Sequence, residues 1–383
     1  MRAALIILNA DAQDAIEVAG RSLPLRQLDF ALAAGCELII GLGNGAGEDA
    51  LAVRHAAEKE GARFRAITNA RAIPALLAPS DDLLVLQGNV LPASRDALAA
   101  FSGSGNILTL PGDVARPGGF ERIDLNRSWA GAMLLPAGLA DGLQSLDEDF
   151  DAPSTLLRLA LQYGIAERPL ALEMVDTGQW AVLTQAKAAD QTRGWLARHI
   201  PPVSGFAPAR WLAQKIVRLG AGKFGSKPGT LQTIIGLAAL SGLAALGAAW
   251  FGLHPAAFAA VALAAVMGQA AILLSRLQSA PFGKTGKVTL VTLVPDIALF
   301  ACSFLAIEGA WFERLFPPLM LLAVLRFLPF HGDREWMRIL RDRLLIAVIL
   351  ALAAGVGLQQ PATMIAAFLA LLPNLRIFGA NRG

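Results

Sequence analysis

The sequence predicts two domains of different class: an α/β domain over residues 1–190 and an all-α domain of six transmembrane helices over residues 231–383, joined by a basic linker over 191–230. Strand-length apolar runs alternate with helix-like segments in the first part. Apolar runs of membrane-spanning length dominate the last part. Cations interleaved with aromatic residues fill the linker. A chain of 383 residues also makes two domains the natural expectation.

The composition agrees with a membrane protein. Hydrophobic residues make up 55% of the chain, and the excess lies almost entirely after residue 230. The net charge of +3 is small, so the basic pI near 9.1 does not indicate nucleic-acid binding; basic cytoplasmic loops give the same value. Cys36 and Cys302 do not form a pattern typical of a disulfide or a metal site. The first apolar run lacks a small-residue cleavage site, and we expect a strand there rather than a signal peptide.

Six segments of the first half have the period of strands or helices. We expect strands at 3–8, 37–41, 63–67 and 82–86, and helices at 25–34 and 49–60. This alternation predicts a mostly parallel sheet with helices on both faces. Ligands of such sheets bind at the carboxyl ends of the strands. The loop after the first strand and Asn89, which closes a later strand, are therefore candidate site positions.

The same half resembles the sugar-nucleotide and inositol-phosphate nucleotidyltransferase family, which includes cytidylyltransferases. AGRSLPLRQLDFALAAGCELII (19–40) is similar to the opening of that family, and RSWAGAMLLPAGL (127–139) to a later core strand. DDLLVLQGNVLPA (81–93) is similar to the strand that ends in a metal-binding aspartate, and VDTGQWAVLTQA (175–186) to the closing aspartate-threonine segment. The resemblance implies a Rossmann-like nucleotidyltransferase fold with a site for CTP and Mg²⁺.

Several positions depart from that family. The first loop, NADAQDAIEVAG, has no early glycine pair, and it carries Asp11, Asp14 and Glu17, which repel phosphates. Asn89 stands where the resemblance implies an aspartate, and an amide is a poor Mg²⁺ ligand. Asp176 keeps the second implied metal position. The sequence thus favours a retained fold with a disabled site, in which Asn89 and Asp176 are nucleotide-site remnants.

The linker contains an amphipathic segment at 209–219. Its apolar residues have helical spacing, and Arg210, Lys215 and Arg218 lie between them. This pattern favours a helix in the membrane interface, next to anionic cytoplasmic lipid. A basic helix packed on the first domain is the alternative.

Six apolar segments follow, and the first three have about the length needed to span a bilayer. They cover 231–253, 255–274, 288–307, 315–329, 344–358 and 362–375. The second and fourth loops are basic, and carry Arg276, Lys284 and Lys287, then Arg334, Arg338, Arg341 and Arg343. The positive-inside rule therefore predicts a multi-pass protein of the inner (cytoplasmic) membrane with both termini and the N-terminal domain in the cytoplasm.

Residues 190–383 resemble the CDP-alcohol phosphotransferase family. The amphipathic helix, the entry KPGTLQTIIGL (227–237) and the junction GQAAILLSRLQSAPFG (268–283) carry this resemblance. The family signature, D-x2-D-G-x2-A-R followed by G-x3-D-x3-D, supplies carboxylates for divalent cations. In the register fixed by Arg276, Gly268 and Ala271 stand at the first two aspartates. In the register that uses Asp296 as the last aspartate, Thr292 stands at the preceding one.

With at most one of these carboxylates kept, we expect no metal and no cofactor. We expect a remnant pocket at the membrane face formed by Arg276, Lys284, Lys287 and Asp296. Asp296 falls inside the third apolar segment, where an unpaired acid is costly, so we expect it to share a cavity with Arg276.

Two functional hypotheses follow from the two resemblances. The first is a catalytically inactive member of phospholipid or polyol-phosphate metabolism, which binds membrane lipid and acts as partner or regulatory subunit of an active homologue or as a homodimer. The second is an active nucleotidyltransferase or phosphotransferase with relocated Mg²⁺ ligands, drawn from Asp11, Asp14, Asp176 and Asp296. A transporter is disfavoured because no internal repeat or line of intramembrane charges is present in the sequence.

Overall fold

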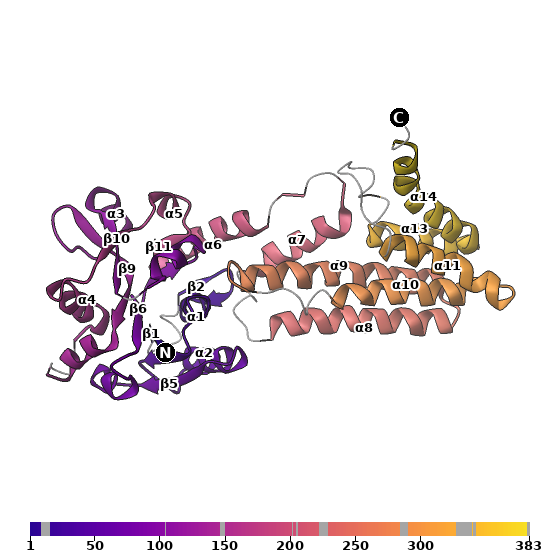
Figure 1. The fold of residues 1–383 in the computed structure, drawn as a ribbon. Helices are drawn as coiled ribbons and strands as arrows, with labels where there is room; N and C mark the ends of the chain where they lie inside the picture. Colours follow the sequence, from indigo (N-terminus) through magenta and orange to yellow (C-terminus); the bar gives the residue numbers. More distant parts are fainter. Residues whose placement is uncertain are drawn as a thin grey trace. The chain divides into compact units, whose positions relative to one another are not determined.

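The computed structural model divides the chain into two compact units (Figure 1). Unit 1 contains Met1–Leu196 and Ser279–Gly283, and unit 2 contains Ala197–Gln278 and Lys284–Gly383. The residues that the structure describes are 1–8, 16–103, 105–145, 150–200, 202–203, 206–221, 229–283, 290–326, 339 and 342–380. Asp11, Asp14, Lys284 and Lys287, which the sequence singles out, lie outside these ranges.

Unit 1 is built on a seven-stranded sheet in the order β10-β8-β9-β6-β1-β4-β5. Its strands are β1 (Arg2–Ile7), β4 (Leu38–Leu42), β5 (Arg63–Ile67), β6 (Asp82–Leu86), β8 (Asn106–Pro111), β9 (Arg127–Pro136) and β10 (Glu167–Pro169). Only β9 runs antiparallel to its neighbours, β6 and β8; the other described pairs are parallel. The sheet confirms the predicted α/β class. The antiparallel direction of β9 was not predicted, because a strand buried on both faces reads as one apolar run in either direction.

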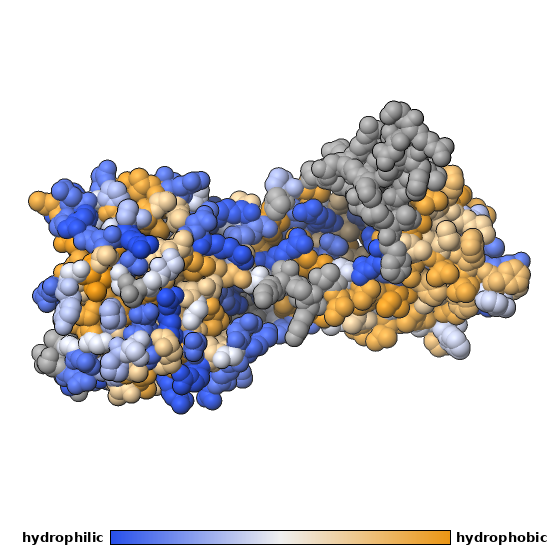
Figure 2. All heavy atoms as spheres, viewed as in Figure 1, coloured by the Kyte–Doolittle hydropathy of each residue, from blue (hydrophilic) through white to orange (hydrophobic). Residues whose placement is uncertain are grey.

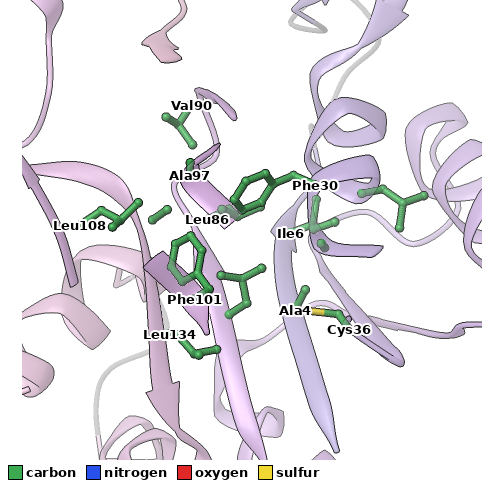
Figure 3. Close-up of a cluster of buried hydrophobic side chains, with 14 of the residues drawn as sticks. Ala4, Ile6, Phe30, Cys36, Leu86, Val90, Ala97, Phe101, Leu108 and Leu134 are labelled. Carbon is green, nitrogen blue, oxygen red and sulfur yellow. The ribbon is translucent and has the colours of Figure 1, made fainter. Parts of the chain in front are cut away.

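Helices cover both faces of this sheet, as the two-residue period of a strand requires. Ala4 and Ile6 of β1 pack in one cluster with α1 (Leu23–Ala33) and α2 (Glu48–Lys59). Ala3 and Leu5 pack in a second cluster with the 3-10 segment η5 (Ala137–Ser145) and α4 (Ala152–Gln162). Figure 3 shows the first cluster, in which the Phe30 ring meets Phe101 edge-on at 5.8 Å between centroids.

Shorter elements complete unit 1. They are β2 (Glu17–Val18), β3 (Arg21–Ser22), η2 (Ala70–Ala72), η3 (Pro74–Leu76), β7 (Val90–Pro92), η4 (Asp96–Phe101), α3 (Gly112–Gly118), α5 (Leu172–Asp176), β11 (Trp180–Val182) and the part of α6 (Gln185–His199) up to Leu196. Two small antiparallel ribbons, β2 with β3 and β7 with β11, lie outside the main sheet.

Unit 1 also holds a segment from the second half of the chain, Ser279–Gly283. Arg26, only 2% exposed, donates from Nη1 to the Ala280 carbonyl at 2.9 Å and stacks on the Trp195 ring at 4.1 Å. Burial lowers the pKa of Arg26 to about 9. The Phe282 ring meets Phe30 edge-on at 5.7 Å. The domain boundaries predicted from the sequence divide the chain into consecutive stretches, so they do not predict that Ser279–Gly283 belongs to unit 1.

Unit 2 is helical. Its helices are α7 (Pro208–Ala221), α8 (Thr230–Trp250), α9 (His254–Ser279), α10 (Leu293–Ala306), α11 (Trp311–Arg326), α13 (Arg343–Gly355) and α14 (Gln359–Ala380). Each of the six predicted apolar segments contains one helix. In the described part of the chain two helices, α8 and α9, are long and apolar enough to cross a membrane by length and composition. The third segment, expected to be of spanning length, contains the 14-residue α10, which at 1.5 Å per residue is about 21 Å long.

Unit 2 exposes many large apolar side chains, and the face that Figure 2 shows has a large apolar area. On α8, Leu237, Leu240 and Leu243 are 46%, 62% and 65% exposed, whereas Ala238 and Gly242 are buried. The polar residues Asp296, Ser303 and Thr363 are instead buried in the interior. Large exposed apolar surfaces of this kind mark contact with a membrane or a protein. Together with the two long apolar helices, this surface supports membrane association of unit 2.

The two ends of these helices differ in chemistry. Short connections at 251–253, 307–310 and 356–358 join α8 to α9, α10 to α11 and α13 to α14, and Gln359 Nε2 donates to the Ala306 carbonyl at 3.0 Å. Trp250 and Trp311, at the α8–α9 and α10–α11 connections, are 76% and 71% exposed. The opposite helix ends carry arginines, among them Arg326 and Arg343.

Candidate functional site

The carboxyl edge of the sheet in unit 1 contains the first candidate residues. Asn89 follows β6, and its Oδ1 is buried with no hydrogen-bond partner among the described residues. Its carbonyl accepts from Leu183 N at 2.8 Å. The antiparallel pairing of Val90 with Val182 directs Asn89 toward Leu183, whereas Asp176 lies beyond the other end of β11 and is exposed.

Gln27 of α1 fixes the turn that carries Asn89. This fully buried amide donates from Nε2 to the Gln87 carbonyl at 2.8 Å and to the Val90 carbonyl at 2.9 Å. The turn is thus tied to the helix that follows the first loop. Among the described residues, no group of three or more His, Cys, Asp or Glu side chains lies close enough to hold a metal ion.

A second candidate site lies in unit 2, where a cavity of about 250 Å³ opens between α7, α9, α10, α11 and α13. Small and apolar residues of α9 and α10 form part of its wall. The polar residues on its wall are Arg210, Gln269, Thr292, Arg326, Asp342 and Arg343.

Asp296 holds two of these arginines in place. The carboxylate is 1% exposed, in the first turn of α10. Arg343 donates from Nε to its Oδ1 at 3.0 Å, and Arg326 Nη1 lies 3.4 Å from its Oδ2. A buried carboxylate must be paired, and the loss of one partner is strongly destabilising. Asp296 therefore fixes the ends of α11 and α13 beside α10.

Asp342 joins two helix N-termini at the same cavity. Its Oδ1 accepts from Leu344 N at 2.9 Å and Leu345 N at 3.2 Å, which caps α13. Its Oδ2 accepts from Ala209 N at 3.1 Å, in the first turn of α7. One carboxylate thus satisfies backbone donors of both helices. Arg210, which follows Ala209, and Arg343, which follows Asp342, both line the cavity.

The charges at this cavity favour an anion. Arg210 forms no ion pair with a described carboxylate, whereas Arg326 and Arg343 share Asp296. Within the described residues, three arginines face two carboxylates, so one positive charge remains. The N-termini of α7 and α13 add partial positive charge. Guanidinium groups with free N–H donors at a partly desolvated wall bind carboxylate and phosphate oxygens well.

The structure corrects the expected partner of Asp296. Arg276 is exposed in the last turn of α9 and does not line the cavity, so Asp296 pairs with Arg326 and Arg343 instead. The physical reason is that α11 and α13 both pack against α10, so that the last residue of α11 and the first residue of α13 lie beside the first turn of α10. One feature of the sequence could have indicated these partners: Arg326 and Arg343 lie near the predicted ends of neighbouring apolar segments.

Two positions where the second resemblance implies metal-binding aspartates do line the cavity. They are Gly268 on α9 and Thr292, which precedes α10. The side chains present at these two positions are small or neutral. Arg210, Arg326 and Arg343, which the resemblance did not single out, line the same cavity.

Comparisons with known proteins give little further information. No family model and no curated protein matches this chain. One solved structure that is similar, the crystal structure of 4-diphosphocytidyl-2C-methyl-D-erythritol synthase, has 15% sequence identity and a TM-score of 0.36, and the match covers 50% of this chain and 97% of that chain.

A double-mutant cycle tests the Asp296 pairing. We expect Asp296→Asn to lower the free energy of unfolding of the detergent-solubilised protein by about 3 kcal/mol, because two arginines lose their buried counter-charge. Arg343→Gln added to that variant should cost little more, so the pair shows a coupling energy of at least about 1 kcal/mol. Arg276→Gln is the matched control, and its effect should add to that of Asp296→Asn. Additive losses for Arg343 in thermal or denaturant unfolding would contradict the pairing.

Proposed function

We propose that this protein is a membrane-bound, non-catalytic binder of phosphate-bearing headgroups in phospholipid or polyol-phosphate metabolism. In this proposal unit 2 lies in the cytoplasmic membrane and its arginine-lined cavity holds the phosphate. Unit 1 is a nucleotidyltransferase-like domain without its activity. The protein then serves as a partner or regulatory subunit, bound to an active homologue or to a second copy.

The observation that carries the proposal is the cavity. Arg210, Arg326 and Arg343, from three different helices, line a space of about 250 Å³ in a helical unit that exposes many large apolar side chains. A membrane protein retains charged groups within its helices only where they are paired or face a polar site. Asp296 partly neutralises Arg326 and Arg343, but Arg210 has no such partner among the described residues. An anionic ligand would supply the missing charge.

The non-catalytic part of the proposal rests on how the carboxylates are used. Both oxygens of Asp342 accept backbone N–H groups, and Asp296 is engaged by two arginines. Neither carboxylate is therefore available to Mg²⁺ without breaking these contacts, and Mg²⁺ requires several oxygen ligands. The alternative, an active phosphotransferase or nucleotidyltransferase with relocated ligands, would be favoured by Mg²⁺-dependent turnover of CTP by the purified protein.

Substitution of Arg210 tests the proposed binding. Calorimetric titration of the full-length protein in a non-ionic detergent with glycerol 3-phosphate should show saturable binding. Arg210→Gln should weaken it by about tenfold, because a charge-assisted hydrogen bond is lost. Lys215→Gln removes one charge from the exposed face of the same helix, where Lys215 stacks on Trp211, and should change the affinity less than about twofold. Equal effects of the two substitutions, or no saturable binding, would refute the proposal.

The proposed orientation places both termini and the arginine-bearing helix ends in the cytoplasm, with the connections at 251–253, 307–310 and 356–358 on the opposite side. Exposed tryptophans at those connections and arginines at the other ends agree with the aromatic belt and the positive-inside rule. Reporter fusions after Gly383 and within 359–361 should report opposite sides of the membrane. Reports from the same side would exclude the six-span arrangement.

A further inference from the structure

We infer that Asp296 acts as an internal counter-anion that sets the charge of the ligand: it makes the cavity fit a singly charged phosphodiester better than a doubly charged phosphomonoester. This inference rests on the proposed phosphate-binding function. It assigns to Asp296 a role in specificity through its own charge and through its pairing with Arg326, without contact with the ligand.

The charge balance supports this assignment. Among the described residues, three arginines and Asp342 line the cavity, and the buried Asp296 pairs with two of these arginines. These five charges sum to one positive charge. A phosphodiester carries one negative charge, whereas a phosphomonoester carries about 1.5 to 2 at pH 7 because its second pKa is near 6. In a partly desolvated site an uncompensated charge is costly. The diester therefore matches the cavity, and the monoester leaves an excess negative charge beside Asp296.

The geometry shows which of the two carboxylates controls this balance. Asp342 is committed to the backbone donors of α7 and α13, so its removal would disturb the helices themselves. Asp296 accepts one hydrogen bond, from Arg343, and its Oδ2 has no hydrogen-bond partner among the described residues. Its contact with Arg326 is an ion pair at 3.4 Å. Asp296 thus acts mainly through charge, and an isosteric amide changes that charge without changing its size.

The two arginines that meet the ligand are expected to be Arg210 and Arg326. Arg343 is tied by its bond to Asp296 and by a second one from Nη2 to the Leu325 carbonyl at 3.2 Å. Arg326 donates from Nη1 to Thr292 Oγ1 at 3.3 Å, at the cavity wall. The neutral polar groups Thr292 and Gln269 on this wall suit a hydroxylated substituent on the phosphate.

The test measures a preference, because a preference separates charge selection from a general loss of fold. The full-length protein in detergent is titrated at pH 7.5 with glycerol 3-phosphate as monoester and glycerophosphoglycerol as diester. The wild type should bind the diester more tightly. Asp296→Asn should shift the ratio of the two dissociation constants by about tenfold toward the monoester, since one negative charge beside the phosphate is removed. Glu308→Gln, which removes an exposed charge near the opposite helix ends, should leave the ratio unchanged.

A second variant keeps the inference testable if Asp296→Asn unfolds. Arg210→Gln lowers the net charge of the cavity by one, and it should shift the ratio in the opposite direction, toward the diester, while it weakens both ligands. An unchanged ratio in both variants, with both probes bound, would overturn the role of Asp296 and leave the proposed phosphate binding intact. Failure of the wild type to bind either probe would instead overturn the proposed function.

A further titration with a lipid shows whether the bound diester is part of a lipid or a free phosphodiester. Short-chain phosphatidylglycerol in the same titration should bind more tightly than glycerophosphoglycerol and show the same dependence on Asp296, because its acyl chains can lie on the apolar surface of unit 2. Equal affinities would mean that the ligand is a free phosphodiester, and the charge rule would still hold. Lipid binding that does not depend on Asp296 or Arg210 would show that the lipid binds outside the cavity and would contradict the inference.

Discussion

The buried carboxylate of Asp296 is the constraint on which the arrangement of unit 2 depends. A charge that is 1% exposed inside a unit with an apolar surface cannot be left unpaired. Its pairing with Arg326 and Arg343 requires the end of α11 and the start of α13 to meet the first turn of α10. Asp342 then links the start of α13 to the start of α7. The cavity lies between these four helices (α7, α10, α11 and α13) and α9.

Unit 2 differs from unit 1 in its surface, which exposes many large apolar side chains. In a membrane the hydrophobic effect does not drive helices together, so packing of small residues and buried polar contacts must hold them. α8 accordingly buries Ala238, Gly242 and Ala245 and exposes leucines. Both units contain buried apolar clusters: unit 1 has one on each face of its sheet, and unit 2 has others between its helices. The surface of unit 2 therefore agrees with association of this unit with a membrane.

Local sequence patterns predict most of the helices and strands correctly, but they do not predict which residues meet at the candidate site. The period of two along β1 and the helical spacing in α7 are local properties, and the predicted strands at 37–41, 63–67 and 82–86 agree with β4, β5 and β6 to within a residue. The partners of Asp296 depend on which of several helix-terminal arginines comes near it, and the expected one, Arg276, is exposed. The place of Ser279–Gly283 in unit 1 depends on the buried Arg26, far away in sequence. Such long-range choices leave no periodic signal.

The central claim is that a phosphate group occupies the arginine-lined cavity of a membrane-embedded helical unit. The most direct measurement is an electron cryomicroscopy structure of the full-length protein in nanodiscs that contain anionic phospholipid. The claim predicts a belt of lipid around α8 and α9, and density for a phosphate within hydrogen-bond distance of the Arg210 and Arg326 guanidinium groups. A cavity without such density, in a map that resolves both arginine side chains, would contradict it.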